Sequence, residues 1–451
     1  MIVIDLHFLR LAVLGTQRVA LANLSRCSYG TVPRPVQESA ERLSREIEAR
    51  PDHFLRLKLY PSLAEVRKQL ASFLNVKLNE LVFTTNASLG LNVALRNFEW
   101  EEGDIIFAFS TTYDSISRTI DYLCDIRPFP KRNIINLEFP TSAEEIIALF
   151  KREARANPAK PGGKRIAVID SITALPSVYL PWKELVKICQ DEGIWSVIDA
   201  AHSIGQEVGL DLSAAAPDFW VSNCHKWLSA KRSCAVLYVP ERNQHIIKSS
   251  IPTSHAYISL RDRTATNFVD QFEWNGTIDH TPFLTIPDGN IRAQHPHDFM
   301  SSPLQSALQF RTRIGGEEKI NAYCRDLAFR GGKVVADILG TCLLDPTGDL
   351  TLNMVNVQLP ISERVPVNKD VHTFIVREIL SHNAYSKLFH YQGKWWTRCS
   401  AQVWNEVIVA FRGIVAIANT KAPPQISDFE KIGHMWLEVF KKVENLYAQH
   451  G

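Results

Sequence analysis

Trp195-Ser-Val-Ile-Asp199 is a short apolar run that ends in a carboxylate, which is typical of a buried strand. Runs of the same character lie before and after it, and stretches with helical spacing separate them. These runs span residues 81–83, 104–108, 166–170, 219–222 and 235–239. Short apolar strands that alternate with helices predict an α/β fold built on a mainly parallel sheet.

The pattern changes after about residue 289. Two long helical stretches, 302–314 and 317–339, precede scattered strands such as Met354-Val-Asn-Val-Gln358. A chain of 451 residues is also too long for one ordinary core. We therefore expect an N-terminal segment (1–30), a large domain (31–289) and a smaller C-terminal α+β domain (290–451).

The composition disfavours nucleic acids, other polyanions and membranes as binding partners. Fifty Lys plus Arg against forty-eight Asp plus Glu leave a net charge of +2, which does not favour nucleic acid or another polyanion. The first 24 residues do not resemble a signal peptide, and no apolar run reaches the ~18 residues that a membrane-spanning helix needs. Eight scattered cysteines without a C-x-x-C motif predict reduced thiols. We expect a cytoplasmic protein without a membrane partner.

Val221-Ser-Asn-Cys-His-Lys-Trp227 carries the strongest sign of chemistry. Lys226 follows an apolar strand, where a buried ammonium is costly unless its pKa falls or it joins a covalent adduct. A lysine of lowered pKa is what imine chemistry requires. The alternative is a lysine whose amine simply reaches solvent.

Asp199 ends another apolar strand, 27 residues before Lys226. A carboxylate opposite a lysine fits pyridoxal 5'-phosphate, which needs an imine-forming lysine and an acid on its pyridine nitrogen. The stretch Thr84-Thr-Asn-Ala-Ser-Leu-Gly-Leu-Asn92 predicts a helix N-terminus suited to a phosphate. Plainer interpretations remain: Asp199 as a helix cap or salt-bridge partner, and the Asn86 segment as an ordinary N-cap.

Together these motifs resemble the class V aminotransferase family of fold-type I pyridoxal-phosphate enzymes, in the branch named after isopenicillin N epimerase. The matching segments are Ser28-Tyr-Gly-Thr-Val-Pro33, Asn86-Ala-Ser88, Asp199 with His202, Asn223-Cys-His-Lys-Trp227, Trp274-Asn-Gly-Thr-Ile-Asp279 and Arg398-Cys-Ser400. The resemblance spans roughly residues 24–405. It implies a large domain with a mainly parallel, seven-stranded type of sheet between helices, and a smaller C-terminal α+β domain.

The resemblance also implies roles for single residues. Lys226 would form the imine with the cofactor and move protons at the substrate's α-carbon, while Asp199 would pair with the pyridine nitrogen. His202 would contact the cofactor's phenolate oxygen or the imine, and Tyr113 would stack on the ring. The implied phosphate contacts are Ala87, Ser88, Asn223, His225 and, from the other subunit of a homodimer, Thr277. The implied substrate contacts are Arg398, which would bind the α-carboxylate, Tyr29 and His255.

The implied activity is that of a pyridoxal-phosphate enzyme that forms an external aldimine and a quinonoid from an amino-acid substrate. Departures from the branch at Ser25-Arg-Cys27 and after Arg398 favour a lyase, or a carbon–carbon or ring-forming step of fungal alkaloid metabolism, as for loline-type proteins. The alternatives are a C–S lyase acting on a cysteine conjugate, as in ergothioneine formation, an amino-acid epimerase, and a non-catalytic binding protein of the same fold.

Two other kinds of site are not expected. A cysteine desulfurase carries a nucleophilic cysteine shortly before its arginine, but residues 381–397 contain none, and Cys399 would point away from Arg398 in a strand. A metal site is disfavoured because a proline separates His295 from His297, and no suitably spaced cysteine or carboxylate accompanies the nearby histidines.

Overall fold

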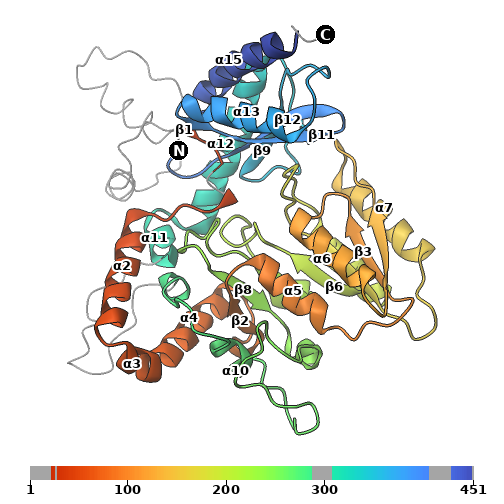
Figure 1. The fold of residues 1–451 in the computed structure, drawn as a ribbon, viewed down its shortest axis with the longest axis vertical. Coiled ribbons are helices and arrows are strands. Elements are labelled where there is room, and N and C mark those ends of the chain that lie inside the picture. Colours follow the sequence, from red (N-terminus) through yellow and green to blue (C-terminus); the bar gives the residue numbers. More distant parts are fainter. Residues whose placement is uncertain (1–21, 26–27, 287–306, 406–427, 449–451) are drawn as a thin grey trace.

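The fold is described from a computed structural model over residues 22–25, 28–286, 307–405 and 428–448. The expected α/β architecture is confirmed (Figure 1), with a seven-stranded sheet of order β2-β8-β7-β6-β5-β3-β4. Its strands are β2 (Leu81–Thr84), β3 (Ile105–Phe109), β4 (Lys131–Ile135), β5 (Arg165–Asp170), β6 (Trp195–Asp199), β7 (Phe219–Ser222) and β8 (Ala235–Tyr238).

The direction of the strands decides where polar side chains gather. Strand β8 is antiparallel to β2 and β7, whereas β7, β6, β5, β3 and β4 are parallel to one another. The carboxyl ends of β2, β3, β5, β6 and β7 therefore meet at one edge of the sheet. In open α/β sheets this edge is where ligands bind.

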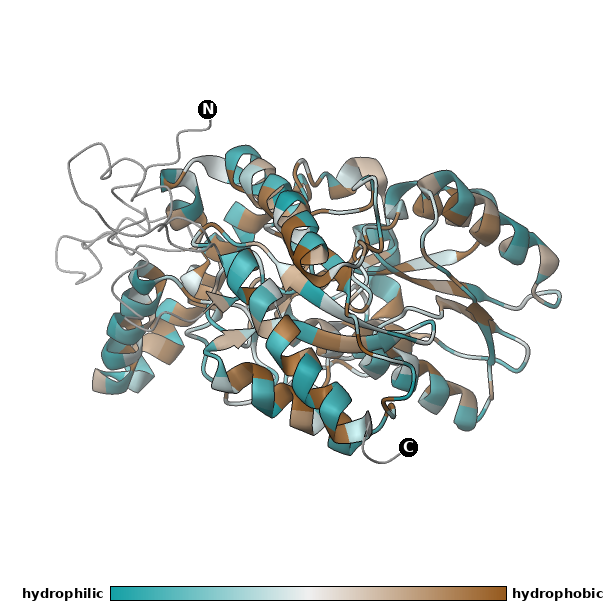
Figure 2. Cartoon of the chain, turned by 90° about the horizontal axis from the view of Figure 1, so that it is seen from above, coloured by the Kyte–Doolittle hydropathy of each residue, from teal (hydrophilic) through white to brown (hydrophobic). Residues whose placement is uncertain are grey.

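Helices cover both faces of this sheet because successive strand residues point to opposite sides. Val197 and Val221 share one core with α5 (Ala87–Asn97) and α6 (Asp114–Asp125), while Ile198 and Trp220 share the other with three more helices. Those three are α4 (Leu59–Leu74), α7 (Ala143–Ala156) and α8 (Trp182–Asp191). Figure 2 shows that the helices of the molecule carry both apolar and polar residues, as a layered arrangement requires.

A smaller sheet lies above the large one in Figure 1 and has the antiparallel order β11-β12-β9. Its strands are β9 (Met354–Gln358), β11 (Lys387–Tyr391) and β12 (Lys394–Ser400), and the helices packed on it are α12 (Gly316–Leu339), α13 (Lys369–Ser381) and α15 (Asp428–Ala448). The other face turns to the large sheet, since Phe389 and Trp396 belong to the large core. Asn356 Nδ2 also donates to Ser177 O across this boundary (2.8 Å).

The remaining strands and α-helices of the described chain are β1 (Ala22–Asn23), α2 (Arg34–Ala49), α3 (Pro51–His53), α9 (Leu212–Ala215), α10 (Asp270–Glu273), α11 (Ala307–Arg313) and β10 (Ala384–Tyr385). Strand β1 pairs in parallel with β10, so the start of the described chain is attached to the C-terminal part. The division into 1–30, 31–289 and 290–451 stays a prediction, and its second boundary falls outside the described residues.

The structure also describes the cysteines, which were expected to be reduced, and the helices, which were not expected to span a membrane. The cysteines at positions 124, 189, 224, 234, 324, 342 and 399 are free thiols, most of them buried. Within the described ranges, every helix is too short or too polar to cross a bilayer. The cytoplasmic location stays a prediction of the sequence.

Candidate active site

The first turn of α5 lies beside the loop that follows β7. A Cβ added to Gly90 would stand 2.7 Å from Val221 Cγ1, so glycine lets α5 approach β7 closely. Asn86 caps the helix by accepting from Leu89 N–H (2.9 Å), and Ala87 N–H donates to Asn223 Oδ1 (2.9 Å). The predicted phosphate contacts Ala87, Ser88 and Asn223 are thus brought together at a helix N-terminus, which favours an anion.

Lys226 and His202 are in direct contact. Lys226 Nζ lies 3.0 Å from His202 Nε2, and Trp227 Nε1–H donates to His202 Nδ1 (3.3 Å). Because indole N–H only donates, Nδ1 is the acceptor, and the proton of the neutral ring is on Nε2. That proton points at the Lys226 amine, and the amine can accept it only in its uncharged form, which is also the form that attacks a carbonyl.

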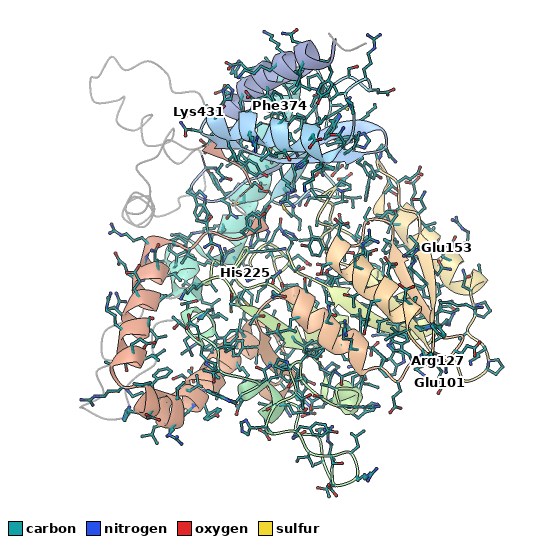
Figure 3. The ribbon with its side chains drawn as sticks, in the orientation of Figure 1. Glu101, Arg127, Glu153, His225, Phe374 and Lys431 are labelled. Atoms are coloured by element: carbon teal, nitrogen blue, oxygen red, sulfur yellow. The ribbon has the colours of Figure 1, made fainter. Side chains whose placement is uncertain are left out.

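Burial keeps the two histidines of this site, His202 after β6 and His225 after β7, neutral. It lowers the pKa of His202 well below its usual range, and the charges of Lys226 and Arg398 lower it further. Burial also lowers the pKa of His225 to about 4, against an opposing hydrogen bond to Cys234 O (2.8 Å from His225 Nδ1). Figure 3 shows His225 near the centre of the molecule, far from Glu101 and Arg127, which precede strands β3 and β4.

Asp199 ends β6 on the same edge of the sheet, and it is 3% exposed. Its Oδ1 accepts from Ala201 N–H (3.0 Å). Burial raises the pKa of Asp199, while the hydrogen bond and the charge of Lys226 oppose that rise. The structure thus brings the predicted lysine, histidine and aspartate together.

Asp170 is a residue of this site that we did not predict. It is the register partner of Asp199 on the neighbouring parallel strand and is 2% exposed. Its Oδ2 is buried without a hydrogen-bond partner among the described residues. Burial, and then the Asp199 charge, raise its pKa well above the usual range, because two adjacent buried carboxylates do not both ionise readily. The carboxylate at the end of residues 166–170 was the available signal.

We expect Asp170→Asn to flatten the pH dependence of stability. A carboxyl whose folded pKa is raised stabilises the protein fully below the unfolded pKa, near 4, and this contribution is lost as pH rises towards the folded pKa. We measure the free energy of unfolding in denaturant between pH 4 and 8. As the pH rises, the value for the variant should increase relative to that of the wild type by up to about 1.4 kcal/mol per pH unit. The exposed Asp191→Asn serves as control, and parallel profiles for wild type and Asp170→Asn would contradict the assignment.

Tyr113 lies between β3 and α6, on the same edge of the sheet. The residue is 47% exposed, which leaves its ring available for stacking on a planar group. The neighbouring Thr111 hydroxyl is buried without a hydrogen-bond partner among the described residues. A buried polar atom of this kind is typical of a binding site in which the ligand supplies the missing hydrogen-bond partner.

Arg398 reaches this edge from the small sheet and is 3% exposed. Its Nη1 donates to Ala174 O (2.8 Å) and its Nη2 to Ser28 Oγ (2.6 Å), so it connects three separate parts of the chain. Cys399 points to the opposite face of β12 and lies in the small core, where burial raises its pKa to about 12. The expectation that Cys399 points away from Arg398 is therefore confirmed.

The segment that holds Ser28 also lies on the lysine loop. Gly30 has a φ of +74°, and an added Cβ would stand 1.6 Å from His225 O. Arg232 donates to Tyr29 O (3.2 Å) and Gly30 O (3.4 Å). Tyr29 is 73% exposed and lines a cavity of about 720 Å³ with Gly30 and Tyr385.

We expect Gly30→Ala to disturb the lysine loop more than its backbone strain alone explains. Gly162 provides the matched control, since its φ is +80° and nothing lies within 4 Å of an added Cβ. Both variants bear the cost of a positive φ, roughly 1 kcal/mol. Only Gly30→Ala should lose further stability and cofactor affinity, as measured by thermal unfolding and cofactor titration. Equal effects at the two positions would rule out the close contact.

Two predicted residues lie apart from this group. Thr277 is exposed and lines a cavity of about 410 Å³ with Thr84, Thr85 and Gly276, and that lining includes neither Lys226 nor Asp199. His255 is also exposed, and no interaction joins it to Lys226 or Arg398 among the described residues. Their roles stay predictions. Of the other histidines, His280 stacks on Trp274 (5.6 Å), and positions 295 and 297 lie outside the described residues.

The residues present fit pyridoxal 5'-phosphate. A helix N-terminus is available for the phosphate, and the Thr111 hydroxyl and one Asp170 carboxylate oxygen, both buried at the same edge, lack partners among the described residues. Lys226 beside a neutral His202 supplies the amine, and Asp199 supplies the acid. This donor set is the one that the cofactor's phosphate, aldehyde and ring nitrogen require.

Comparisons with known proteins agree with this site. The family described as Aminotransferase class-V matches residues 31–277. The L-cysteine desulfhydrase-like protein lolT1 of Epichloe uncinata is 32% identical over 85% of this chain and 89% of its own length. Hercynylcysteine sulfoxide lyase of Schizosaccharomyces pombe is 28% identical over 85% of this chain and 90% of its own. Isopenicillin N epimerase of Amycolatopsis lactamdurans also matches, at 24% identity over 66% of this chain and 76% of its own.

A solved structure supports the fold. C-DES, in a variant with glycine covalently linked to its PLP cofactor, superimposes with a TM-score of 0.70 at 15% identity. The superposition covers 95% of this chain and 98% of that one. The resemblance inferred from the sequence motifs is thus confirmed. The chain belongs to the class V aminotransferase family and is a pyridoxal-phosphate enzyme of fold type I.

Proposed function

We propose that the protein is a C–S lyase that eliminates a sulfur leaving group from the β-carbon of a cysteine-derived amino acid. The observation that carries the proposal is the Lys226 amine, 3.0 Å from a neutral His202 and on the same sheet edge as Asp199. Two relatives support the sulfur chemistry, since they bear the names L-cysteine desulfhydrase-like protein and hercynylcysteine sulfoxide lyase.

The cofactor, when bound, supplies an electron sink for the electron pair of the substrate's α-carbon. Arg398 binds the α-carboxylate through its guanidinium. Lys226, as an uncharged amine, takes the α-proton, and His202 orients that amine through Nε2–H. The balanced overall reaction converts the cysteine conjugate and one water into a thiol, pyruvate and ammonium. The position of Cys399 supports release of the sulfur as a free thiol, because its thiol faces the small core.

The proposal is tested by incubating the holoenzyme with S-substituted cysteines in D₂O. Release of pyruvate with one equivalent of thiol supports it. A D-amino acid with deuterium at the α-carbon and no pyruvate would instead indicate an epimerase. Absence of any turnover, together with no borohydride trapping of cofactor on Lys226, would indicate a non-catalytic binding protein.

Cys399→Ala should keep its lyase activity within about twofold, because the thiol lies in the small core. We expect a loss of stability of roughly 1 kcal/mol from the small cavity, measured by thermal unfolding. Thiol release is assayed in parallel. Loss of sulfur transfer in this variant would mean that the cysteine takes part in the reaction, as in a desulfurase.

The carbon–carbon or ring-forming step in fungal alkaloid metabolism remains a prediction of the sequence. The departures that suggested it involve residues 25–27 and the chain after Arg398, and positions 26–27 and 406–427 lie outside the described ranges. Formation of a cyclic amine from an amino acid that contains no sulfur, without release of pyruvate, would favour the ring-forming step over C–S cleavage.

We further infer a homodimer in which Thr277 serves the phosphate of the partner's site. The exposure of Thr277, which leaves its hydroxyl available to a partner chain, supports this assignment. Thr277→Ala should weaken cofactor binding by about three- to tenfold, as expected for loss of one hydrogen bond, without changing the sedimentation behaviour. A monomer at micromolar concentration would exclude the arrangement.

A further inference from the structure

Lys387 is a second cation beside Arg398. The two residues are direct register partners in the antiparallel pair β11–β12. Directly opposite residues of such a pair project to the same face, with Cβ atoms roughly 5 Å apart. Lys387 and Arg398 therefore stand side by side on one face of the small sheet.

That face turns to the large sheet. Along the same face, Phe389 and Trp396 belong to the core that contains the large sheet's residues. Further along, Tyr391 Oη accepts from Phe139 N–H (3.0 Å). Lys387 thus projects into the boundary between the two sheets, where Arg398 meets Ala174 O, and not into open solvent.

Lys387 is half-buried and forms no ion pair with any residue in the described ranges. Burial, and then the charge of Arg398, lower its pKa, and only Asp114, in the first turn of α6, acts in the opposite direction. His372 is also near, and burial followed by the charge of Lys387 lowers the pKa of that imidazole. Like charges placed directly opposite one another are destabilising, so an anion bound beside Lys387 would stabilise the pair.

We propose that Lys387 binds a second anionic group of the substrate, a carboxylate carried by the side chain or the sulfur substituent, while Arg398 binds the α-carboxylate. The inference rests on the proposed function, because it takes Arg398 as the α-carboxylate contact. It names the substrate class as cysteine conjugates that carry two carboxylates. A charged hydrogen bond between the lysine and a carboxylate discriminates strongly against a neutral group of the same shape.

The test compares two ligands that differ only in this charge, S-carboxymethyl-L-cysteine and its neutral amide, S-carbamoylmethyl-L-cysteine. Their affinities for the holoenzyme are read from the rapid change in cofactor absorbance on mixing, before turnover. We expect the wild type to prefer the carboxymethyl ligand by about tenfold or more. Lys387→Met should abolish this preference and leave the affinity for the amide within about twofold.

Lys394→Met is the matched control. Lys394 lies on β12, two pairs along the same face, but it is exposed, with its amine 3.5 Å from Gln358 Oε1. It should keep the wild-type preference. A wild type without preference, or a preference that survives in Lys387→Met, would overturn the inference. Equal weakening of both ligands in Lys387→Met would also overturn it, because Lys387 would then act on the α-carboxylate.

The two proposals fail in different ways. If neither ligand yields pyruvate and thiol while the carboxymethyl ligand still binds more tightly through Lys387, the C–S lyase is excluded and the anion site stands. If both ligands are cleaved and bound alike, the lyase stands and the anion site is excluded.

Discussion

We expect Lys226→Ala to lose turnover by about 10²–10⁴-fold or more, which is the contribution of a positioned proton-transfer group. The variant lacks the amine that lies 3.0 Å from His202 Nε2, so it loses both the covalent attachment and the proton carrier. Borohydride reduction followed by peptide mass analysis should find no cofactor on the lysine loop. Turnover is measured with saturating cofactor, so weaker binding does not account for the loss.

The exposed Lys187→Ala on α8 serves as the control for this experiment. It removes one lysine from the large domain without touching the site and should keep wild-type turnover and labelling. If Lys226→Ala were still labelled by borohydride at another lysine and still turned over, the central role of Lys226 would be refuted.

Asp199→Asn should lower kcat by about 10²–10⁴-fold while the cofactor stays attached to Lys226. The amide preserves the shape of the side chain, but it carries no charge to hold a protonated ring nitrogen. Borohydride labelling should therefore match the wild type, which separates this variant from Lys226→Ala. The measurements are kcat for the holoenzyme and the labelled fraction of Lys226.

The comparison at this position uses Asp191→Asn, an exposed carboxylate at the end of α8. It should change kcat by less than about twofold. A fully active Asp199→Asn would mean that the cofactor nitrogen needs no acid here, and the role of Asp199 would reduce to its contact with Ala201 N–H.

The central part of the site was predictable because it depends on local pattern. Two runs of apolar residues, one ending at Asp199 and one ending shortly before Lys226, predict buried strands with polar residues at their ends. In a parallel sheet those ends meet at one edge, so the sequence also indicates that the two side chains converge. The small residues of the Asn86 segment likewise predict a helix N-terminus, and α5 begins there.

The missed residues depend on register. Asp170 was visible as a strand end, but only the pairing of β5 with β6 makes it the neighbour of Asp199. Lys387 and Arg398 are 11 positions apart, and the turn between β11 and β12 makes them opposite one another. A shift of one residue would put either side chain on the other face, and no local pattern fixes that register.

The α/β class, the lysine and the acid follow from the amino-acid sequence alone, because the spacing of apolar residues reveals which strands are buried and in what order they come. The groups around them become known only once the chain is folded: the neutral His202, the paired Asp170, Ser28 beside Arg398, and the second cation at Lys387. These contacts join positions far apart in the chain, and their energies arise from burial and charge that exist only after the two sheets pack together.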